Sequence, residues 1–337
     1  MRIFSGIQPT GRKHLGNFIG AIEPYVEWQE RGEAIYCVVD LHATTVPYEP
    51  QRMRESVYDT AVLLLAAGID PERCVFFRQS DVPEHTELTW LLSSVTAFGD
   101  LNRMHQFKDK AGAQRDLVSA SLFTYPTLMA ADVLAYRAQQ VPVGDDQRQH
   151  IELMRDIAIR FNARFAPGRE GDAAPLIVPE GVYREVGARI MDLQEPTRKM
   201  STTGGTEQGT VLVLDEPKTI ERKFKRAVTD SGAEIVRQPD KPGVSNLIEI
   251  YAAVRGRTFD AVEAEFADAR YGDFKVAVAE AVVERLAPVQ ARYAELREDE
   301  SALEEILAAG AAKAHAIAAP IVAEVRDLMG VGPNRGG

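Results

Sequence analysis

The sequence contains little cysteine and no long apolar run. Cys37 and Cys74 are its two cysteines, and each lies in a short apolar run of the kind that forms a buried strand. Two thiols are too few for a zinc site built from cysteine, and we expect both to be reduced core residues. No apolar run approaches the roughly 20 residues of a membrane span, and the chain starts like a strand rather than a signal peptide. We therefore expect a cytoplasmic protein with no membrane partner.

The chain also lacks an excess of positive charge. Its formal net charge is −11, with 45% hydrophobic and 26% charged residues. Such an acidic chain is not expected to coat nucleic acid non-specifically, and DNA is not an expected partner. Contact with RNA is still possible through a local basic patch. Its 337 residues exceed one average domain, so two domains are expected.

The opening loop, residues 6–17, has neither of the two common phosphate-binding signatures, because it lacks both G-x-G-x-x-G and a Gly-Lys-Ser/Thr ending. It carries Gly11, His14 and Gly16 instead, between a short apolar run and an amphipathic one. This pattern predicts a strand, a glycine-rich turn and a helix start. Such a turn at the carboxyl edge of a parallel sheet can bind phosphate through backbone N–H groups and the helix dipole. Taken alone, it is more often only a turn.

Short apolar runs alternate with amphipathic segments from residue 6 to residue 165. This alternation predicts a doubly wound, Rossmann-like parallel sheet that binds ligands at the carboxyl ends of its strands. Residues 166–184, rich in proline, glycine and charge, predict a surface excursion. After the first strand, further strands are predicted at 34–39, 74–77 and 141–144, and helices at 50–67, 85–98, 122–136 and 146–165.

The last third of the chain follows a helical period. The last strand-like run is 211–213, and apolar residues recur at helical spacing from residue 217 onward. We therefore expect an α/β catalytic domain over residues 1–203. A mostly α-helical domain is expected over residues 204–337, with its last helix free to pack back on the first domain.

Four segments are placed to converge on one crevice: 6–17, 40–42, 144–147 and 199–203. Each also has an ordinary structural explanation, such as a packed histidine at His42 or helix-start charges at Asp145 and Asp146. Asp132 is more informative, because it lies on a predicted helix among small and apolar neighbours. A carboxylate there needs a donor, so it is either a structural acceptor or the specificity group of a ligand pocket. The residues alone leave these two readings equal.

Two motifs resemble the paired signatures of class I aminoacyl-tRNA synthetases. They are Gln8-Pro9-Thr10-Gly11 with His14-Leu15-Gly16-Asn17, and Lys199-Met200-Ser201. Narrower stretches resemble the bacterial tryptophanyl-tRNA synthetases, and the likeness covers nearly the whole chain. It implies a homodimeric ligase that joins L-tryptophan to ATP with Mg²⁺, releasing pyrophosphate, and passes tryptophan to the 3′ end of tRNA(Trp). The narrower stretches are 124–132, 141–147, 187–191, 227–231 and 241–247.

The resemblance implies catalytic roles for His14, Asn17, Lys199 and Ser201, which would position the reactants and stabilise charge on the leaving pyrophosphate. No residue is implied as a metal ligand, because the phosphates of ATP hold Mg²⁺. Lys108 and Lys110 are further candidates at the leaving group. The ATP-binding residues that it implies are Gln8, Pro9, Thr10, Gly16, Asn17, Gly144, Asp145, Asp146, Ile190, Lys199, Met200, Ser201, Thr202 and Thr203.

For the amino acid, the resemblance implies that Asp132 accepts a hydrogen bond from the indole N–H, the single polar group of that side chain. Tyr125 and Gln147 would hold the ammonium group. The other implied tryptophan-binding residues are Phe4, His42, Met129, Val141 and Val143. For tRNA, the densest basic patch is Arg222, Lys223, Lys225 and Arg226, which is otherwise explained as a solvated helix face.

The chain departs from the family pattern at Thr202, where the second signature normally has a lysine. Either another cation takes the place of this lysine at the triphosphate, or the activation of the amino acid is weaker. Three functions stay open: an active tryptophan–tRNA ligase, a tyrosyl-specific relative, and a synthetase-like paralogue that senses tryptophan or binds a partner. The presence of His14, Lys199, Ser201 and Asp132 with a complete helical domain disfavours the third.

Overall fold

The computed structural model describes residues 1–104, 118–183, 189–202 and 204–333. Within these residues, five parallel strands form one sheet in the order β3-β2-β1-β4-β5. The strand order reverses between β1 and β4, the point at which doubly wound sheets bind their ligands. The strands are β1 (Arg2–Ile7), β2 (Glu33–Val38), β3 (Val75–Arg78), β4 (Gln140–Pro142) and β5 (Glu180–Val182).

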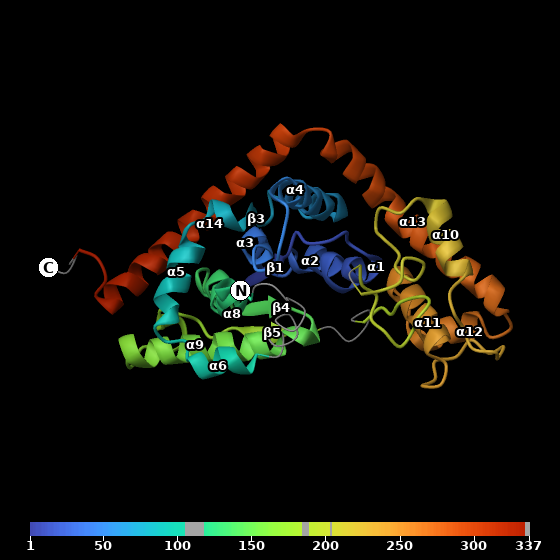
Figure 1. The fold of residues 1–337 in the computed structure, drawn as a ribbon, viewed down its shortest axis with the longest axis horizontal. Coiled ribbons are helices and arrows are strands. Elements are labelled where there is room, and N and C mark those ends of the chain that lie inside the picture. Colours follow the sequence, from blue (N-terminus) through green and yellow to red (C-terminus); the bar gives the residue numbers. More distant parts are fainter. Residues whose placement is uncertain (105–117, 184–188, 203, 334–337) are drawn as a thin grey trace.

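Helices connect the strands and cover the sheet, as the alternating pattern predicts (Figure 1). The predicted helix at 85–98 is wrong in one respect, because it is two helices. The side-chain hydroxyls of Ser94 and Thr96 donate to the carbonyls of Leu91 and Leu92, which favours ending the helix there. The connecting helices are α2 (Glu23–Trp28), α3 (Asp40–Ala43), α4 (Pro50–Ala67), α5 (Glu84–Ser93), α6 (Phe98–Arg103), α8 (Ala120–Leu134) and α9 (Arg148–Phe165).

Two short segments differ from the sequence expectation. The predicted surface excursion contains β5, an edge strand of three residues that is too short to show a pattern of alternation. Residues 211–213 are not a sheet strand. They cross the opening loop, where Leu15 N–H donates to Val211 O at 2.8 Å and Val213 N–H donates to Lys13 O at 3.0 Å.

The helices after residue 217 have two locations (Figure 1). Helices α10, α11 and α13 pack together at one end of the molecule, with α12 against α11, and α13 then runs along α4. Helix α14 is long and apolar enough, by length and composition, to cross a membrane. In the fold it packs on β3 and α5, and its Leu307, Ala314 and Val325 are fully buried. The bounds are α10 (Pro217–Lys225), α11 (Pro242–Arg255), α12 (Phe259–Glu265), α13 (Tyr271–Arg297) and α14 (Glu300–Met329).

Candidate active site

The opening loop holds His14 and Asn17 at the start of α1 (Leu15–Asn17) by a reciprocal pair of bonds. Asn17 N–H donates to His14 Nδ1 at 3.3 Å, and His14 N–H donates to Asn17 Oδ1 at 3.1 Å. Burial and the nearby charges of Lys199 and Lys13 lower the pKa of His14 to about 4. The ring is therefore neutral near pH 7. Because Nδ1 accepts, the proton lies on Nε2, which can donate to a phosphate oxygen.

The helical segment that follows begins with a π-helical turn and then continues as a regular α-helix. A π-turn, η1 (Phe18–Ile22), leads into α2, where Pro24 has no N–H to give to the helix ladder. This region places an apolar face on the cavity beyond it, with Ala21, Tyr25 and Trp28 at helical spacing. The Tyr25 hydroxyl donates to Gly6 O at 3.4 Å, which ties that face to the end of β1.

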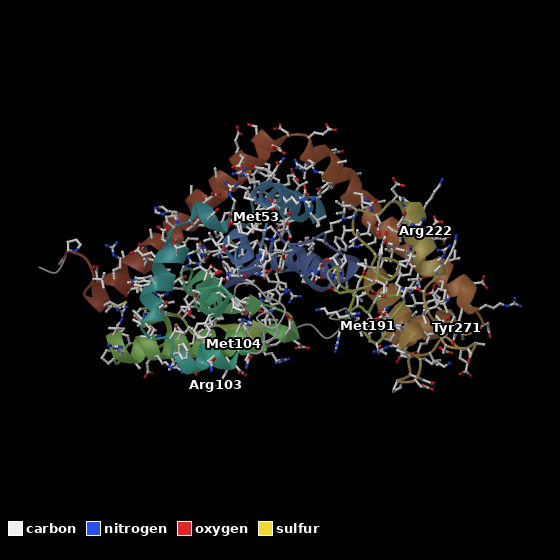
Figure 2. The ribbon with its side chains drawn as sticks, in the orientation of Figure 1. Met53, Arg103, Met104, Met191, Arg222 and Tyr271 are labelled. Carbon is white, nitrogen blue, oxygen red and sulfur yellow. The ribbon has the colours of Figure 1, made fainter. Side chains whose placement is uncertain are left out.

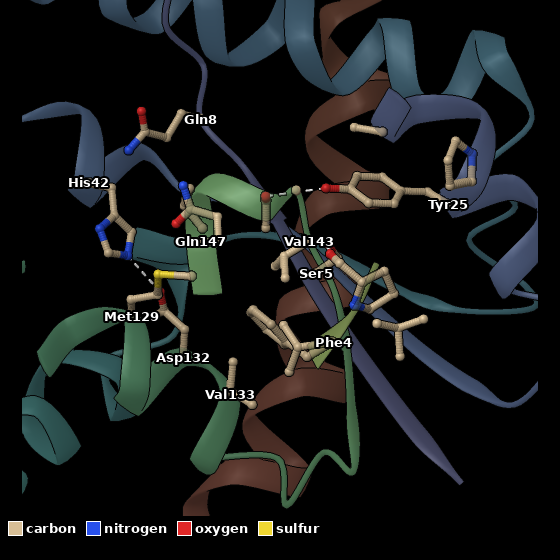
Figure 3. A pocket seen from close by; sticks show the side chains of 18 of the residues that line it. Phe4, Ser5, Gln8, Tyr25, His42, Met129, Asp132, Val133, Val143 and Gln147 are labelled. Carbon is tan, nitrogen blue, oxygen red and sulfur yellow. Dashed lines mark hydrogen bonds and ion pairs between the residues drawn. The ribbon is translucent and has the colours of Figure 1, made fainter. Parts of the chain in front are cut away.

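A cavity of about 550 Å³ opens at the carboxyl ends of β1 and β4 (Figure 3). Gln8, Gly144 and Asp146 from the expected ATP set line it as well, so the two expected sites are continuous. The cavity lies at the reversal of strand order, where this fold class binds ligands. All eight residues expected around the amino acid line it: Phe4, His42, Tyr125, Met129, Asp132, Val141, Val143 and Gln147.

Asp132 is the buried charge of this cavity, and three side chains from neighbouring segments hold it. His42 Nε2 lies 2.7 Å from Asp132 Oδ2, while Gln79 Nε2 and His85 Nδ1 lie 2.7 Å and 2.6 Å from Oδ1. Burial by itself would raise the pKa of Asp132, but His42 and His85 hold it well below its usual range. A carboxylate with this surrounding stays ionised, and it faces a mostly apolar space (Figure 3).

Two neutral polar groups lie on the same cavity wall. The Tyr125 hydroxyl lies 2.8 Å from His150 Nε2, and burial with the Asp146 charge raises the pKa of Tyr125 to about 12. Gln147 donates from Nε2 to Asp146 Oδ2 at 2.7 Å, which turns its amide nitrogen toward that carboxylate. Tyr125 and Gln147 thus offer oxygen atoms to a ligand cation such as an ammonium group.

The second signature approaches the first at Gly11. Gly11 has φ of +67°, and a Cβ built there would lie 3.1 Å from Thr202 Oγ1, so the two loops meet at this point. Lys199 is exposed and close enough for its charge to affect His14, whereas Met200 is buried. Ser201 Oγ accepts the N–H of Gly204 at 3.3 Å.

The other residues expected at ATP have different surroundings. Ile190 is buried, and its Cβ lies 3.4 Å from a Cβ built on Gly16. Asp145 is exposed and pairs with Arg148 at 2.7 Å. Pro9 is buried in the opening loop, and Thr10 is exposed there. Thr203, Lys108 and Lys110 lie outside the described residues.

Comparison with known proteins identifies this architecture. The family described as "tRNA synthetases class I (W and Y)" matches residues 1–287. A tryptophan–tRNA ligase from Bacillus anthracis is 47% identical over 334 residues, which cover 99% of each chain. The chain belongs to this class I tRNA synthetase family.

Two solved structures agree with that assignment. The tryptophanyl-tRNA synthetase of Mycoplasma pneumoniae aligns with a TM-score of 0.89 at 34% identity, over 98% of both chains. That of Campylobacter jejuni, complexed with ADP and tryptophan, aligns with a TM-score of 0.81 at 32% identity, over 98% of this chain and 100% of the other. The likeness therefore includes the helical end of the synthetase as well as its sheet.

The expected basic patch of the synthetase needs one correction. Arg222 and Arg226 are exposed, and Lys225 is exposed beside Glu221. Lys223 instead points inward, with 5% of its surface exposed, and donates to Asp215 Oδ2 at 2.7 Å and to Thr210 O at 2.6 Å. Its position on a helix with a buried face, shared with Ile220 and Phe224, is the physical reason. Lys223 is therefore not part of an exposed RNA-binding patch.

Several residues of the site were not anticipated from the sequence. Gln79 and His85 donate to Asp132 and are fully buried, yet neither stands out in the sequence, where Gln79 follows the predicted strand at 74–77 and His85 begins the predicted helix at 85–98. A signal was available, since a buried carboxylate needs donors and both residues follow the predicted third strand. Tyr25 and Trp28 could have been found from their helical spacing behind the opening loop.

Proposed function

We propose that this synthetase is an active tryptophan–tRNA ligase that forms tryptophanyl-adenylate from tryptophan and ATP and then charges tRNA(Trp). The ionised Asp132 at the wall of a mostly apolar cavity carries this proposal. An indole is a large apolar group with one N–H donor, so this cavity suits it. A full-length relative named tryptophan–tRNA ligase and a neighbour complexed with ADP and tryptophan support the same assignment.

The activation step requires positioning rather than a covalent enzyme intermediate. The tryptophan carboxylate attacks the α-phosphorus of ATP, and pyrophosphate leaves with the electron pair of the broken P–O bond. We assign to His14 Nε2–H and Asn17 the role of donors to phosphate oxygens, and to Lys199 that of a cation for the leaving group. We assign to Ser201 a contact with the triphosphate on the same side. His14 and Asn17 lie at a helix start, where an anion is stabilised.

Magnesium enters this reaction as the complex with ATP. Among the described residues, no three histidine, cysteine or acidic side chains converge to form a metal site of the protein's own. As the family resemblance implies, we assign Mg²⁺ to the phosphate oxygens of ATP, and Asp145 and Asp146 to the adenosine side of the site. A hard cation with few protein ligands is usual where phosphates supply the oxygens.

For tRNA, the proposed contacts are the exposed Arg222 and Lys225 in the last turn of α10 and the exposed Arg226 directly after it. Figure 2 labels Arg222 on this helix. Phosphate recognition requires exposed cations, and these three residues supply them within an acidic chain. The reaction serves protein synthesis, so we place the enzyme in the cytoplasm.

We further propose a homodimer. Trp90 of α5 and Phe98 of α6 are 80% and 71% exposed, and Phe98 lies against Phe123 with ring centroids 5.0 Å apart. A contiguous exposed apolar patch marks an association surface, and we assign these side chains to the proposed dimer interface. Light scattering of the wild type and of Trp90→Asp tests this, and a wild-type monomer would contradict it.

Amino-acid-dependent ATP–pyrophosphate exchange tests the proposed function. Purified enzyme with Mg²⁺-ATP and labelled pyrophosphate should form labelled ATP with tryptophan, and far less with tyrosine or phenylalanine. Phenylalanine has no N–H to donate to Asp132, so it lacks one hydrogen bond to a charged acceptor, which is worth about 1.5–3 kcal/mol. Exchange that depends on tyrosine, or none with any amino acid, would overturn the proposal.

A further inference from the structure

The second signature begins on a short two-stranded ribbon. Met200 N–H donates to Ile190 O at 3.0 Å, and Asp192 N–H donates to Arg198 O at 2.8 Å. Met191 and Lys199 face each other between these two bonds as an antiparallel pair. The backbone at Lys199 is therefore fixed by the position of residues 190–192.

The outer edge of this ribbon is fastened to the helical end of the molecule. In such a ribbon, successive residues direct their N–H and C=O groups to opposite edges, so those of Met191 point away from Lys199. Both meet the side chain of Asn246 on α11. Met191 N–H donates to Asn246 Oδ1 at 2.8 Å, and Asn246 Nδ2 donates to Met191 O at 3.0 Å. Asn246 is 4% exposed, and Met191 lies beside the helices at this end of the molecule (Figure 2).

The rest of the loop base is closed by Asp192. Its buried carboxylate accepts the N–H of Thr206 at 2.9 Å and that of Gln194 at 2.8 Å, which joins the two ends of the loop. Gly209 permits this approach, because a Cβ there would lie 1.6 Å from Asp192 Oδ1. The loop base is thus a closed unit, and a shift at Met191 is transmitted to Lys199 rather than absorbed within the base.

We propose that Asn246 is a positioning residue for the signature loop: through Met191, it sets the position of Lys199 relative to His14 and the bound triphosphate. This inference rests on the proposed function for its kinetic part. Asn246 belongs to α11, one of the helices packed at one end of the molecule. Movement of α11 would therefore shift Lys199 on the ATP side of the site. Its side chain does not line the tryptophan cavity.

The same helix provides a matched control. Ser245 Oγ accepts the N–H of Gln238 at 3.2 Å and donates to Gln238 O at 3.1 Å, the same two-bond pattern directed at a different segment. Asn246→Ala and Ser245→Ala each remove two bonds from α11. The first should lower kcat/KM for ATP in the exchange reaction by about tenfold or more, with tryptophan affinity within about twofold of wild type. Ser245→Ala should leave both near the wild-type values.

Amide hydrogen exchange provides a readout independent of catalysis. The N–H groups of Met191, Asp192 and Met200 should exchange faster in Asn246→Ala than in Ser245→Ala. Asn246→Asp keeps an acceptor for Met191 N–H but sets a carboxylate oxygen against Met191 O, so the same N–H groups should again exchange faster than in Ser245→Ala. This variant serves if the alanine variant does not fold. Equal exchange and equal ATP kinetics in the two alanine variants would overturn the proposal. If the wild type shows no tryptophan-dependent activity, the proposed function fails, but the hydrogen-exchange comparison still decides the role of Asn246.

Discussion

The carboxylate of Asp132 lies 2.7 Å from the imidazole of His42, and both side chains line the cavity that opens between β1 and β4. The acid comes from α8 and the imidazole from α3, so the contact joins two connections on opposite sides of β1. Gln79 and His85 complete the set of donors on the other oxygen. The charge therefore stays in place without a ligand, and a ligand donor adds to a preorganised site.

Asp132→Asn should weaken tryptophan binding by about 10- to 100-fold while ATP affinity stays within about twofold. The amide keeps the size of the side chain but loses the negative charge that favours the hydrogen bond from the indole N–H. Its NH₂ group also faces protein donors, such as His42 or Gln79, instead of acceptors. Equilibrium binding of each ligand measures this directly. Asp156→Asn, an exposed carboxylate paired with Arg160 on α9, is the control. Equal loss of both ligands would indicate a structural role for Asp132.

The low pKa of His14 predicts a pH-dependent stability. An unfolded histidine takes up a proton near pH 6.5, whereas the pKa of folded His14 is about 4. Between these values the unfolded state binds more protons, so stability falls as pH falls, by up to roughly 3 kcal/mol at pH 4. His14→Asn keeps an N-cap acceptor and should remove this part of the slope. Urea unfolding of both proteins from pH 7 to pH 4 measures it, and parallel curves would contradict the assignment.

The sequence predicts the sheet and most of the helices because buried parallel strands and amphipathic helices leave strong periodic patterns, as at residues 34–39 and 50–67. It does not predict β5, whose three residues leave no pattern. The separation of α5 and α6 depends on hydroxyl groups that bond to carbonyls, which periodicity does not report. Likewise, the density of cations at 222–226 did not show that Lys223 shares the buried face of α10 with Ile220 and Phe224.

The candidate site, like the fold, is predicted from the sequence only in part. Eight cavity residues could be named from motifs, since short motifs fix residue types at the ends of β1, β4 and α8. The donors to Asp132 could not all be named, because the packing of α5 on α8 brings His85 to it, and Gln79 reaches it from the short turn after β3. The contact of Asn246 with Met191 spans 55 residues and leaves no local signal.

Thr202→Lys tests the residue at which the synthetase departs from its family. Thr202 is exposed at the junction with Gly11, so a lysine can extend toward the leaving pyrophosphate. A second cation should raise the rate of ATP–pyrophosphate exchange by roughly tenfold. Thr202→Gln, of similar length without charge, is the matched control. If lysine and glutamine act alike, another cation of the chain already fills that role.

Charge reversal on α10 tests the proposed tRNA surface. Arg222→Glu with Lys225→Glu should raise KM for tRNA and lower the salt dependence of aminoacylation, by about one unit of slope for each lost phosphate contact. ATP–pyrophosphate exchange does not use tRNA and serves as the internal reference. Arg292→Glu reverses an exposed charge on α13 and controls for net charge. Unchanged salt dependence would show that the patch is only a solvated helix face.

Lys223→Met should act on stability rather than on tRNA. The lysine is buried and pairs with Asp215 at 2.7 Å, so its loss leaves a buried carboxylate without its cation, at a cost of about 3–5 kcal/mol. Lys223→Met with Asp215→Leu removes the whole pair and should recover much of that loss, because an apolar pair needs no counter-charge. Unfolding in urea across the double-mutant cycle measures the coupling. Asp215 also accepts the N–H of Leu212, which bridges to His14, so the single variant should loosen the opening loop as well. A single variant as stable as the wild type would refute this structural role of Lys223.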